Sequence, residues 1–500
     1  MINVLEYLEK SAAKYPDKVA FTGLNTSVTF GQMLKISQAI GCSLIEVGAY
    51  KEPVVILMNR SPEMIVSFFG VISAGCYYVP IDEQMPSHRT ELIIDQLKPR
   101  YIITDNKDNP SIPEDATVLC YSDIVSNLCE NIVPCDTLAL RRSCAIDKDP
   151  IYIVFTSGST GVPKGVITTH RCVIDYVEQL TTIIGANHDS VFGMQSPLYV
   201  DACLKEIYST LKFGATTHIV PTTLFTQPVK LVEFLNEHQI NIVCWVVPAL
   251  TFISSLKTFK TIVPQHLKTI AFGSEVFPPK QLKVWRETLP DAKFINLYGP
   301  TEATGMCCHY EVTDKTDLEK PVPIGKPFPN KEILLLDENG NMVQNGEVGE
   351  ICIRGISLSP GYFNNPEVTS KAFVQNPLNT LYPDLIYKTG DLGRYNEDGD
   401  LEFVSRKDFQ IKHMGYRIEL GEIEMLTCKV EGVENVCCLY DGEKKKISLF
   451  YMGTIEKGQL VATLKGKLPR YMIPNTVIQL DLMPLTANGK TDRNALKQML

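Results

Sequence analysis

Short apolar runs alternate with segments of helical periodicity through the first part of the chain. In residues 54–82, the apolar run VVILM precedes a segment with Ile65, Phe68 and Ile72 at helical spacing, and CYYVPID follows it. The same rhythm recurs at residues 100–104, 151–155, 191–194, 217–220, 240–246, 269–272 and 293–296. Repeated strand–helix–strand units predict an α/β fold of mostly parallel sheets covered by helices.

The pattern changes after residue 331, where short β-rich runs alternate with turn residues. EILLLDENGNMV and GEVGEICIRG contain Asn-Gly and similar turns, which predict an antiparallel module. A further hairpin ends at Arg406, and about 95 residues with their own helix–strand alternation follow it. We therefore expect a large N-terminal core of residues 1–405 that includes this small β module. We also expect a small, mobile C-terminal α+β lid domain of residues 406–500.

The composition is that of a soluble globular protein, with 44% hydrophobic and 21% charged residues among 500. The 57 acidic and 48 basic residues give a net charge of −9, which argues against broad binding to nucleic acid or anionic lipid. Residues 1–15 lack the unbroken apolar stretch of a secretion signal, and Asn241 and Pro248 interrupt the most apolar stretch, residues 240–256. We expect a cytoplasmic monomer that binds neither nucleic acid nor membranes.

The 15 cysteines follow no recognisable metal or disulfide pattern. No CxxC motif is present, and the adjacent pairs at 307–308 and 437–438 do not have the ligand spacing of an ordinary zinc site. Most cysteines lie in apolar, strand-like runs. We expect reduced, buried thiols that pack as small hydrophobic side chains.

The segment IYIVFTSGSTGVPKGV, residues 151–166, joins a buried strand to a loop rich in glycine and hydroxyl groups. Glycine allows close approach of the backbone, and hydroxyl and amide groups donate hydrogen bonds, so such a loop can surround phosphate oxygens. A shorter pattern of this kind would fit an ordinary turn equally well. The loop is not a Walker loop, because Pro163 and Gly165 stand where that motif needs glycine and Ser or Thr. The candidate phosphate ligands are Thr156, Ser157, Gly158, Ser159, Thr160, Gly161 and Lys164.

This loop resembles the phosphate-binding signature of the ANL superfamily, which contains acyl-CoA synthetases, adenylation domains of nonribosomal peptide synthetases, and luciferases. Other motifs of that family follow in its order: FGVISAGCYYVPID (69–82), NLYGPTEAT (296–304), YKTGDLGR (387–394), SRKDFQIKHMGYRIELGEIE (405–424), LPRYMIP (468–474) and LTANGKTDR (485–493). They cover essentially the whole chain. The resemblance implies a ligase that uses ATP and Mg²⁺ to form an acyl-AMP and then passes the acyl group to a thiol.

The motif NLYGPTE has the chemistry of a nucleotide site. Tyr298 offers a flat face for adenine, and Glu302 can hold a hard cation such as Mg²⁺. The resemblance implies those same roles, and it also assigns Asn296 to the adenine edge and Thr301 to the α-phosphate. It makes Thr301 and Glu302 catalytic residues together with Lys490.

Asp391 and Arg406 are the candidates for binding the ribose. A carboxylate can accept both ribose hydroxyls, and an arginine can hold ribose or phosphate oxygens. The family motifs match both positions, although Ser405 replaces the glycine that usually precedes the arginine. The resemblance implies further ATP contacts from Gly273, Ser274, Glu275, Leu297, Gly299, Pro300 and Phe403.

Lys490 follows an Asn-Gly turn, where a lone lysine is ordinarily a surface charge. The resemblance implies that the lid places Lys490 between the substrate carboxylate and the α-phosphate, where it offsets negative charge. For the second step it implies rotation at the hinge residue Asp408. Lys412 and Gly415 would then line the tunnel for the phosphopantetheine arm of a separate carrier protein.

Asp201 bears most directly on the class of acid. The resemblance implies that this carboxylate pairs with the α-ammonium of an amino acid, and a buried carboxylate needs such a partner; the alternative is a helix N-cap. Lys205 would favour an acidic or strongly hydrogen-bonding side chain if it points inward, and would be a surface lysine if it points outward. The other pocket positions, aligned by motif, are Ala202, Ala249, Ile270, Phe272, Leu297, Gly305 and Met306, with Lys490 at the carboxylate.

We therefore expect a free-standing amino-acid adenylation enzyme of the peptide-synthetase type. A D-alanine carrier-protein ligase is the nearest alternative, although Ala202 and Lys205 differ from the apolar residues usual in that pocket. An acyl- or aryl-CoA ligase would lack the carboxylate of Asp201. A non-catalytic relative would be expected to lose Lys490, Glu302 or Asp391, and all three are present.

Overall fold

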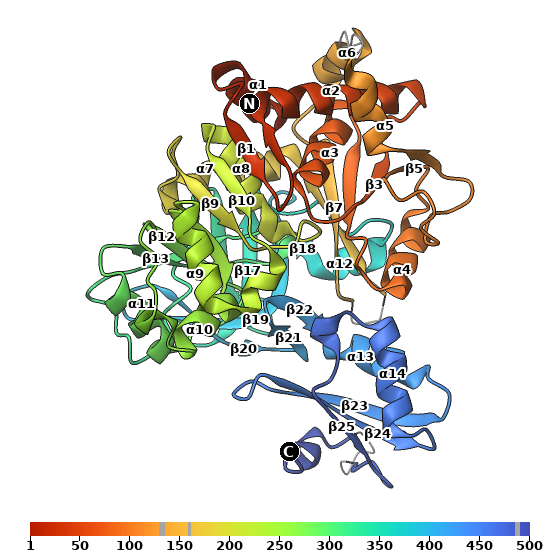
Figure 1. The fold of residues 1–500 in the computed structure, drawn as a ribbon. Helices are drawn as coiled ribbons and strands as arrows, with labels where there is room; N and C mark the ends of the chain where they lie inside the picture. Colours follow the sequence, from red (N-terminus) through yellow and green to blue (C-terminus); the bar gives the residue numbers. More distant parts are fainter. Residues whose placement is uncertain (130–135, 159–161, 486–490) are drawn as a thin grey trace. The chain divides into compact units, whose positions relative to one another are not determined.

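The computed structural model describes residues 1–129, 136–158, 162–485 and 491–500 (Figure 1). By contacts, the chain forms two compact units. The first contains residues 1–83, 99–154 and 165–407, and the second contains residues 84–98, 155–164 and 408–500.

The first unit contains a six-stranded sheet with the order β6-β5-β3-β4-β7-β8. Its strands are β3 (Pro53–Leu57), β4 (Tyr77–Ile81), β5 (Tyr101–Ile103), β6 (Thr117–Leu119), β7 (Pro150–Thr156) and β8 (Lys164–Thr169), the last residues of β7 and the first of β8 belonging to the second unit. The strands from β6 to β7 pair in parallel. Helix α3 (Pro62–Ser73) connects β3 to β4 and begins after Ser61, whose hydroxyl accepts a hydrogen bond from the Met64 amide. The predicted strand–helix–strand unit at residues 54–82 is therefore confirmed.

A nine-stranded sheet has the order β15-β14-β13-β12-β11-β9-β10-β1-β2. The strands from β13 to β1 pair in parallel, whereas β2, β14 and β15 are antiparallel to their neighbours. The bounds are β1 (Val19–Thr22), β2 (Ser27–Thr29), β9 (Val191–Met194), β10 (Thr216–Ile219), β11 (Ile242–Val246), β12 (Thr269–Gly273), β13 (Lys293–Tyr298), β14 (Cys308–Val312) and β15 (Lys326–Pro327). The sequence predicted five of these strands at nearly the same residues.

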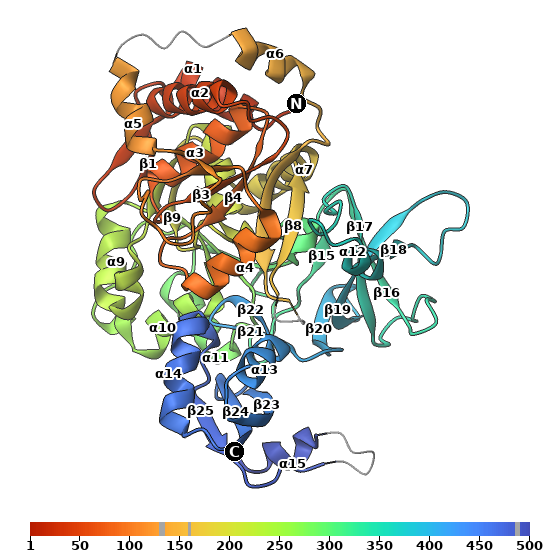
Figure 2. The same ribbon diagram turned by 90° about the vertical axis from the view of Figure 1, so that its right-hand side faces the viewer.

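Helices enclose the two sheets, and one large apolar core includes side chains from both of them (Figures 1 and 2). Helix α2 begins at a capping box formed by Thr29 and Gln32. The helices of this unit are α1 (Leu5–Lys14), α2 (Phe30–Glu46), α3, α5 (Tyr121–Ser126), α6 (Asp136–Cys144), α7 (His170–Ile184), α8 (Leu204–Phe213), α9 (Pro228–Glu237), α10 (Val247–Ser255), α11 (Pro279–Thr288) and α12 (Pro366–Ala372).

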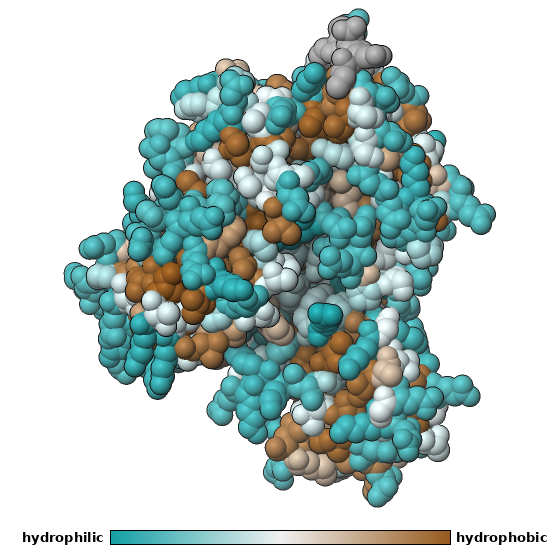
Figure 3. Space-filling model, in the orientation of Figure 1, coloured by the Kyte–Doolittle hydropathy of each residue, from teal (hydrophilic) through white to brown (hydrophobic). Residues whose placement is uncertain are grey.

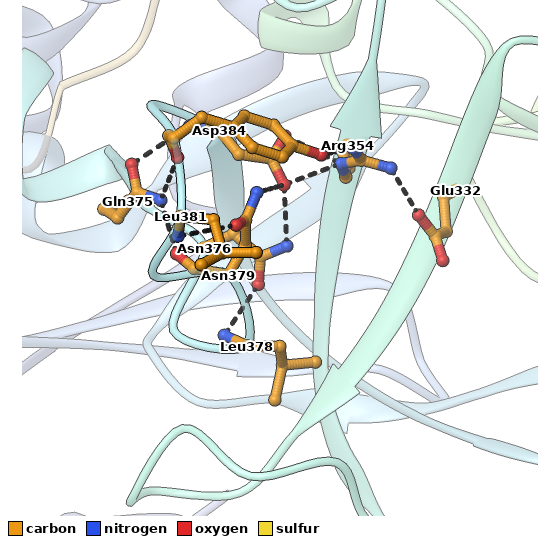
Figure 4. Close-up of polar contacts among 9 residues, drawn as sticks. Glu332, Arg354, Gln375, Asn376, Leu378, Asn379, Leu381 and Asp384 are labelled. Carbon is orange, nitrogen blue, oxygen red and sulfur yellow. Dashed lines mark hydrogen bonds and ion pairs between the residues drawn. The ribbon is translucent and has the colours of Figure 1, made fainter.

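The predicted antiparallel module is present as a five-stranded sheet, visible in Figure 2 around β16 and β18. Its strands are β16 (Lys331–Leu336), β17 (Gly349–Gly355), β18 (Phe373–Gln375), β19 (Leu385–Tyr395) and β20 (Leu401–Arg406). Arg354 on β17 binds Asp384 through Nε, 2.7 Å from Oδ1, and Glu332 through Nη1, 2.9 Å from Oε2 (Figure 4). Asn376 and Asn379 also donate to Asp384, so these contacts hold the loop before β19 against the sheet.

The second unit has its own apolar core and a three-stranded sheet. Its elements are α4 (Ser87–Leu97), β21 (Gln410–His413), β22 (Tyr416–Glu419), α13 (Leu420–Cys428), β23 (Val433–Asp441), β24 (Lys446–Gly453), α14 (Lys457–Lys467), β25 (Thr476–Gln479) and α15 (Arg493–Lys497). The contact boundary after residue 407 lies beside Asp408, but the unit also includes α4 and part of the phosphate loop. The functional division at residues 405 and 406, with its hinge, stays a prediction.

The surface in Figure 3 is mostly hydrophilic, and its apolar side chains form separate patches. Among the residues that the structure describes, no helix combines the length and apolar character needed to cross a membrane. Most of the described cysteines are free and buried, as the sequence predicted.

Candidate active site

The nucleotide motif NLYGPTE begins in β13 and ends in a 3-10 turn, Thr301–Ala303. Asn296 is nearly buried, and its side-chain amide donates to the carbonyl of Pro323 over 2.8 Å. Gly273 lies beside this strand at the end of β12, where a Cβ atom would lie 2.4 Å from the carbonyl oxygen of Leu297. Only glycine permits this close approach of the two strand ends.

Three separate sequence motifs meet at Asp391. The hydroxyl of Tyr298 donates to Asp391 Oδ2 over 2.5 Å, and Arg406 donates to Oδ1 of the same carboxylate. Asp391 and Arg406 are direct partners in the β19–β20 pairing, which sets this contact. Burial and the adjacent Asp391 carboxylate raise the pKa of Tyr298, so its hydroxyl remains a hydrogen-bond donor.

Glu302 is fully buried in the 3-10 turn that follows β13. Its Oε1 accepts a hydrogen bond from the Tyr362 hydroxyl over 2.7 Å, and its main-chain carbonyl accepts one from the Ser359 amide. A carboxylate fixed in this way is a suitable hard ligand for Mg²⁺. Within the described ranges, no group of three or more acidic, His or Cys side chains could hold a metal ion. A cation at Glu302 would therefore need oxygens from a bound ligand or water.

The described part of the phosphate loop belongs to the second unit. The Ser157 hydroxyl donates to the carbonyl of Arg417 over 2.9 Å, and a Cβ atom on Gly158 would lie 2.0 Å from the carbonyl oxygen of Val162. Glycine at 158 is therefore required for this turn. Of the other predicted phosphate ligands, Thr156 and Lys164 end β7 and begin β8, while Ser159, Thr160 and Gly161 lie outside the described residues.

A narrow cavity lies at the carboxyl ends of β11, β12 and β13, the edge of a parallel sheet at which ligands commonly bind. Its walls include four of the predicted substrate residues, namely Lys205, Phe272, Leu297 and Met306. Three of the predicted ATP residues also line it: Gly273, Ser274 and Leu297, which was predicted for both ligands. The walls also include four residues that the sequence reasoning missed: Cys244, Trp245, Val246 and Ala271. Three of them, Cys244, Trp245 and Val246, end the predicted strand 240–246, which pairs with β12. Their position at the end of that strand could have indicated them.

Five predicted pocket residues do not line this cavity: Asp201, Ala202, Ala249, Ile270 and Gly305. Ala249 and Ile270 contribute to the apolar core between α10 and β12. Asp201 begins a 3-10 turn, Asp201–Cys203, that leads into α8.

Lys205 and Glu206 are consecutive residues of α8 and are both buried, with 5% and 0% of their surfaces exposed. Both carboxylate oxygens of Glu206 lack a hydrogen-bond partner in the structure. Burial raises the pKa of Glu206 to about 7, against the opposing effect of the charges of Lys205 and Arg60. At 5% exposure Lys205 is not a surface lysine, and its preference for an acidic or hydrogen-bonding side chain stays a prediction.

The remaining predicted residues lie in several elements. Phe403 is an exposed residue of β20, and Ser274 adopts a left-handed backbone conformation with a φ of 71°. In the second unit, Asp408 accepts a hydrogen bond from the Gln410 amide, and Gly415 lies with a φ of 82° between β21 and β22. Lys412 belongs to β21, whereas Lys490 falls outside the described residues.

Comparisons with known proteins agree with these motifs. The AMP-binding enzyme family matches residues 8–363. The chain is 32% identical over 516 residues to zwittermicin A synthase ZmaJ of Bacillus cereus, covering 99% of this chain and 94% of that protein. It is 31% identical over 497 residues to surfactin synthase subunit 2 of Bacillus subtilis (strain 168), covering 98% of this chain but only 14% of that relative.

The fold is shared with a solved structure, an artificially fused adenylation-PCP di-domain, NpsA-ThdA, from Klebsiella oxytoca. The TM-score is 0.82 at 22% sequence identity, covering 95% of this chain and 93% of that chain. This likeness confirms the predicted α/β fold of the ANL superfamily. From the family match and the nearly full-length similarity to ZmaJ, the chain belongs to the AMP-binding enzyme family, as its ordered motifs predicted.

Proposed function

We propose that this chain activates an amino acid with ATP and transfers it to the phosphopantetheine thiol of a carrier protein. In the first step a carboxylate oxygen of the amino acid attacks the α-phosphorus, and the bond to pyrophosphate breaks. In the second step the thiol sulfur attacks the acyl carbon, the thiol proton is released and AMP leaves. The observation that carries the proposal is the contact of Tyr298 and Arg406 with Asp391, because it assembles three nucleotide motifs at one buried carboxylate.

Asp391 is suited to accept hydrogen bonds from the ribose hydroxyls, since Tyr298 and Arg406 hold its carboxylate in place. Glu302 would hold Mg²⁺ together with phosphate oxygens of ATP, and the cation would offset the charge of the phosphates. The Thr301 hydroxyl would contact the α-phosphate. These assignments follow the family motifs position by position.

The amino-acid class rests on Asp201 and on the kind of relatives that the chain resembles. The relatives named above are a zwittermicin A synthase and a subunit of surfactin synthase, and the fused protein NpsA-ThdA is an NRPS di-domain. Asp201 would pair with the substrate α-ammonium, a contact that a fatty or aryl acid cannot make. NpsA-ThdA unites an adenylation domain with a PCP domain, which supports a carrier protein as the acceptor here.

The second compact unit would contribute to both steps. We assign Lys490 to the bridge between the substrate carboxylate and the α-phosphate during adenylate formation. Rotation at Asp408 would then withdraw Lys490, and the turn that contains Lys412 and Gly415 would line the path of the phosphopantetheine arm. The left-handed backbone at Gly415 suits a tight turn, because glycine has no Cβ atom to oppose it.

ATP–pyrophosphate exchange tests the proposal, with Mg²⁺ and a panel of L- and D-amino acids, fatty acids and aryl acids. We expect exchange with one amino acid or a small group of amino acids, and a loss of about 10- to 100-fold in the Asp391→Asn variant, which keeps the shape of the side chain but not its charge. Lys283→Met, at an exposed surface ion pair, is the matched control. Exchange confined to D-alanine would identify the D-alanine ligase alternative. Exchange confined to fatty or aryl acids, or no exchange at all, would refute amino-acid activation.

A further inference from the structure

The ammonium group of Lys205 occupies an unusual position for a lysine. The residue is 5% exposed and forms part of the wall of the narrow cavity at the ends of β11, β12 and β13. Among the described residues, neither a hydrogen bond nor an ion pair connects its Nζ to a protein acceptor. A ligand that supplies an anion in this cavity would meet the cation of Lys205 among mostly apolar walls, where an ion pair is stronger than in water.

The neighbouring Glu206 does not fill this role. The charge of Lys205 acts to lower the pKa of Glu206, so the two side chains interact electrostatically. However, both carboxylate oxygens of Glu206 lack a hydrogen-bond partner, and the two residues form no ion pair. The other cavity walls are mostly apolar, including Trp245, Phe272 and Leu297. The cavity therefore combines one cationic group with apolar surroundings, which strengthens an interaction with a single anionic group.

We infer that Lys205 binds the side-chain carboxylate of the substrate, so that the enzyme selects an acidic amino acid. This inference rests on the proposed amino-acid activation and specifies the substrate class of that same site. Lys205 is a specificity-determining residue in this scheme, and it takes no part in the bond changes of either step.

The positions of Asp201 and Lys205 suit the two ends of such a substrate. They are four residues apart, in the 3-10 turn and in the first turn of α8. Residues at this spacing lie on the same side of a helix, with their Cβ atoms about 5–6 Å apart. Asp201 would bind the α-ammonium outside the narrow cavity, whose walls it does not form, and Lys205 would bind the side-chain carboxylate within the cavity.

The same cavity opposes other side chains. It has about 10 Å³ of free space, which is the room for about one water-sized group, so any amino-acid side chain larger than that, acidic ones included, would require the walls to move. A basic side chain would place its cation beside the ammonium of Lys205, and this repulsion would be strong in the buried setting. The charge of Lys205 thus favours an acidic side chain over a basic one.

Two pairs of amino acids with nearly the same shape provide the test. Exchange is measured with glutamate against glutamine and with aspartate against asparagine, because the members of each pair differ mainly in charge. We expect the preferred acid to exceed its amide by at least about tenfold in kcat/KM, as a charge-assisted hydrogen bond requires. If the unmodified enzyme has equal kcat/KM for the acid and its amide, or a higher value for the amide, the inference is overturned.

The variant Lys205→Met retains the length and apolar stem of the side chain and removes its charge. We expect it to lose about 10- to 100-fold in kcat/KM for the acid while its activity with the matching amide stays equal or rises. Lys230→Met, at an exposed position on α9, is the control and should keep the preference for the acid. A variant that loses acid and amide equally would show that Lys205 does not read the side-chain charge.

Failure of this inference differs from failure of the proposed function. If some neutral amino acid supports exchange and Lys205→Met does not change the preference, amino-acid activation stands and the acidic substrate class falls. If no amino acid supports exchange with either enzyme, the proposed function itself falls. Binding of glutamate or aspartate measured by calorimetry, in the presence of ATP and Mg²⁺, gives a second readout that does not depend on turnover.

Discussion

Replacement of Glu206 by glutamine should change how the stability of the first unit depends on pH. Glu206 is fully buried, its two carboxylate oxygens have no hydrogen-bond partner, and burial raises its pKa to about 7. Lys205 and Arg60 act in the opposite direction but do not cancel the effect. In the unfolded chain the same carboxyl group has its usual pKa near 4.5.

The sign of the effect follows from where the proton is bound. Between about pH 4.5 and 7 the folded protein keeps a proton on Glu206 that the unfolded chain releases, so the free energy of unfolding falls as the pH rises. The difference between the two pKa values, at about 1.4 kcal/mol per pKa unit, corresponds to about 3 kcal/mol. This stability is present below pH 4.5 and is lost above pH 7. Glutamine does not titrate, so the Glu206→Gln variant lacks this loss.

Urea unfolding followed by tryptophan fluorescence measures the stability of the first compact unit, which contains Glu206. Trp245 and Trp285 are the two tryptophans of the chain, and both lie buried in one apolar cluster of the first unit. Between pH 5 and pH 8, the free energy of unfolding of Glu206→Gln should rise relative to the unmodified protein by about 2–3 kcal/mol. Glu233→Gln, at an exposed position on α9, is the control and should follow the unmodified protein at every pH.

A difference between Glu206→Gln and the unmodified protein that stays constant from pH 5 to pH 8 would refute the reasoning. It would mean that the Glu206 carboxyl group titrates alike in the folded and unfolded chains. A variant that becomes relatively less stable at pH 8 would mean that the ionised carboxylate stabilises the fold, which is possible only if it has a partner. Either result would also weaken the description of Lys205 as an unpaired cation.

Two buried ion pairs give further predictions. Lys331→Met removes a fully buried lysine whose Nζ lies 2.7 Å from Asp175, and the unpaired carboxylate should lower the free energy of unfolding by about 3–5 kcal/mol in urea titrations. Unchanged stability would contradict this, and the double variant with Asp175→Leu should recover most of the loss. In the second unit, Arg89→Met breaks the ion pair with Glu422 and should increase hydrogen exchange across residues 420–428 more at pH 8 than at pH 5, after correction for intrinsic rates. Burial raises the pKa of Glu422, so at the lower pH protonation can remove the charge that the variant leaves unpaired. Equal increases in exchange at both pH values would contradict this.

The sequence predicted the strands and the main site motifs because both depend on local patterns. Short apolar runs located β11, β12 and β13 to within two residues at each end, and the ordered motifs identified the family. The contact between Tyr298 and Asp391 joins residues 93 positions apart, and no local pattern specifies such a contact. It depends on how β13 and β19 pack, which is a property of the folded unit.

The segments that make up the second unit also could not be predicted from local sequence patterns. Periodicity predicts that a segment such as α4 has an apolar face, but it does not name the surface against which that face packs. In the structure, Arg89 on α4 binds Glu422 on α13 over 2.9 Å, and these residues are 333 positions apart. A division drawn by order along the chain therefore placed α4 with the core, whereas the contacts group it with the C-terminal residues.

The case of Lys205 shows why burial can carry more information than residue type. The sequence LKEIYSTLKF has two charged residues near the start of α8, and ordinary amphipathic reasoning would place them on the solvent side. In the structure every residue from Leu204 to Leu211 is buried, because α8 packs against α1, α7, β9 and β10. The side chains of adjacent residues point about 100° apart on a helix. Because Lys205 and Glu206 are both buried, neither side chain can point into solvent at this part of α8. Such a helix must place a charge against protein or against a ligand. Lys205 lines the cavity at the ends of β11, β12 and β13, and no ion pair joins it to a carboxylate of the described residues, so a substrate anion in that cavity would have this cation to bind.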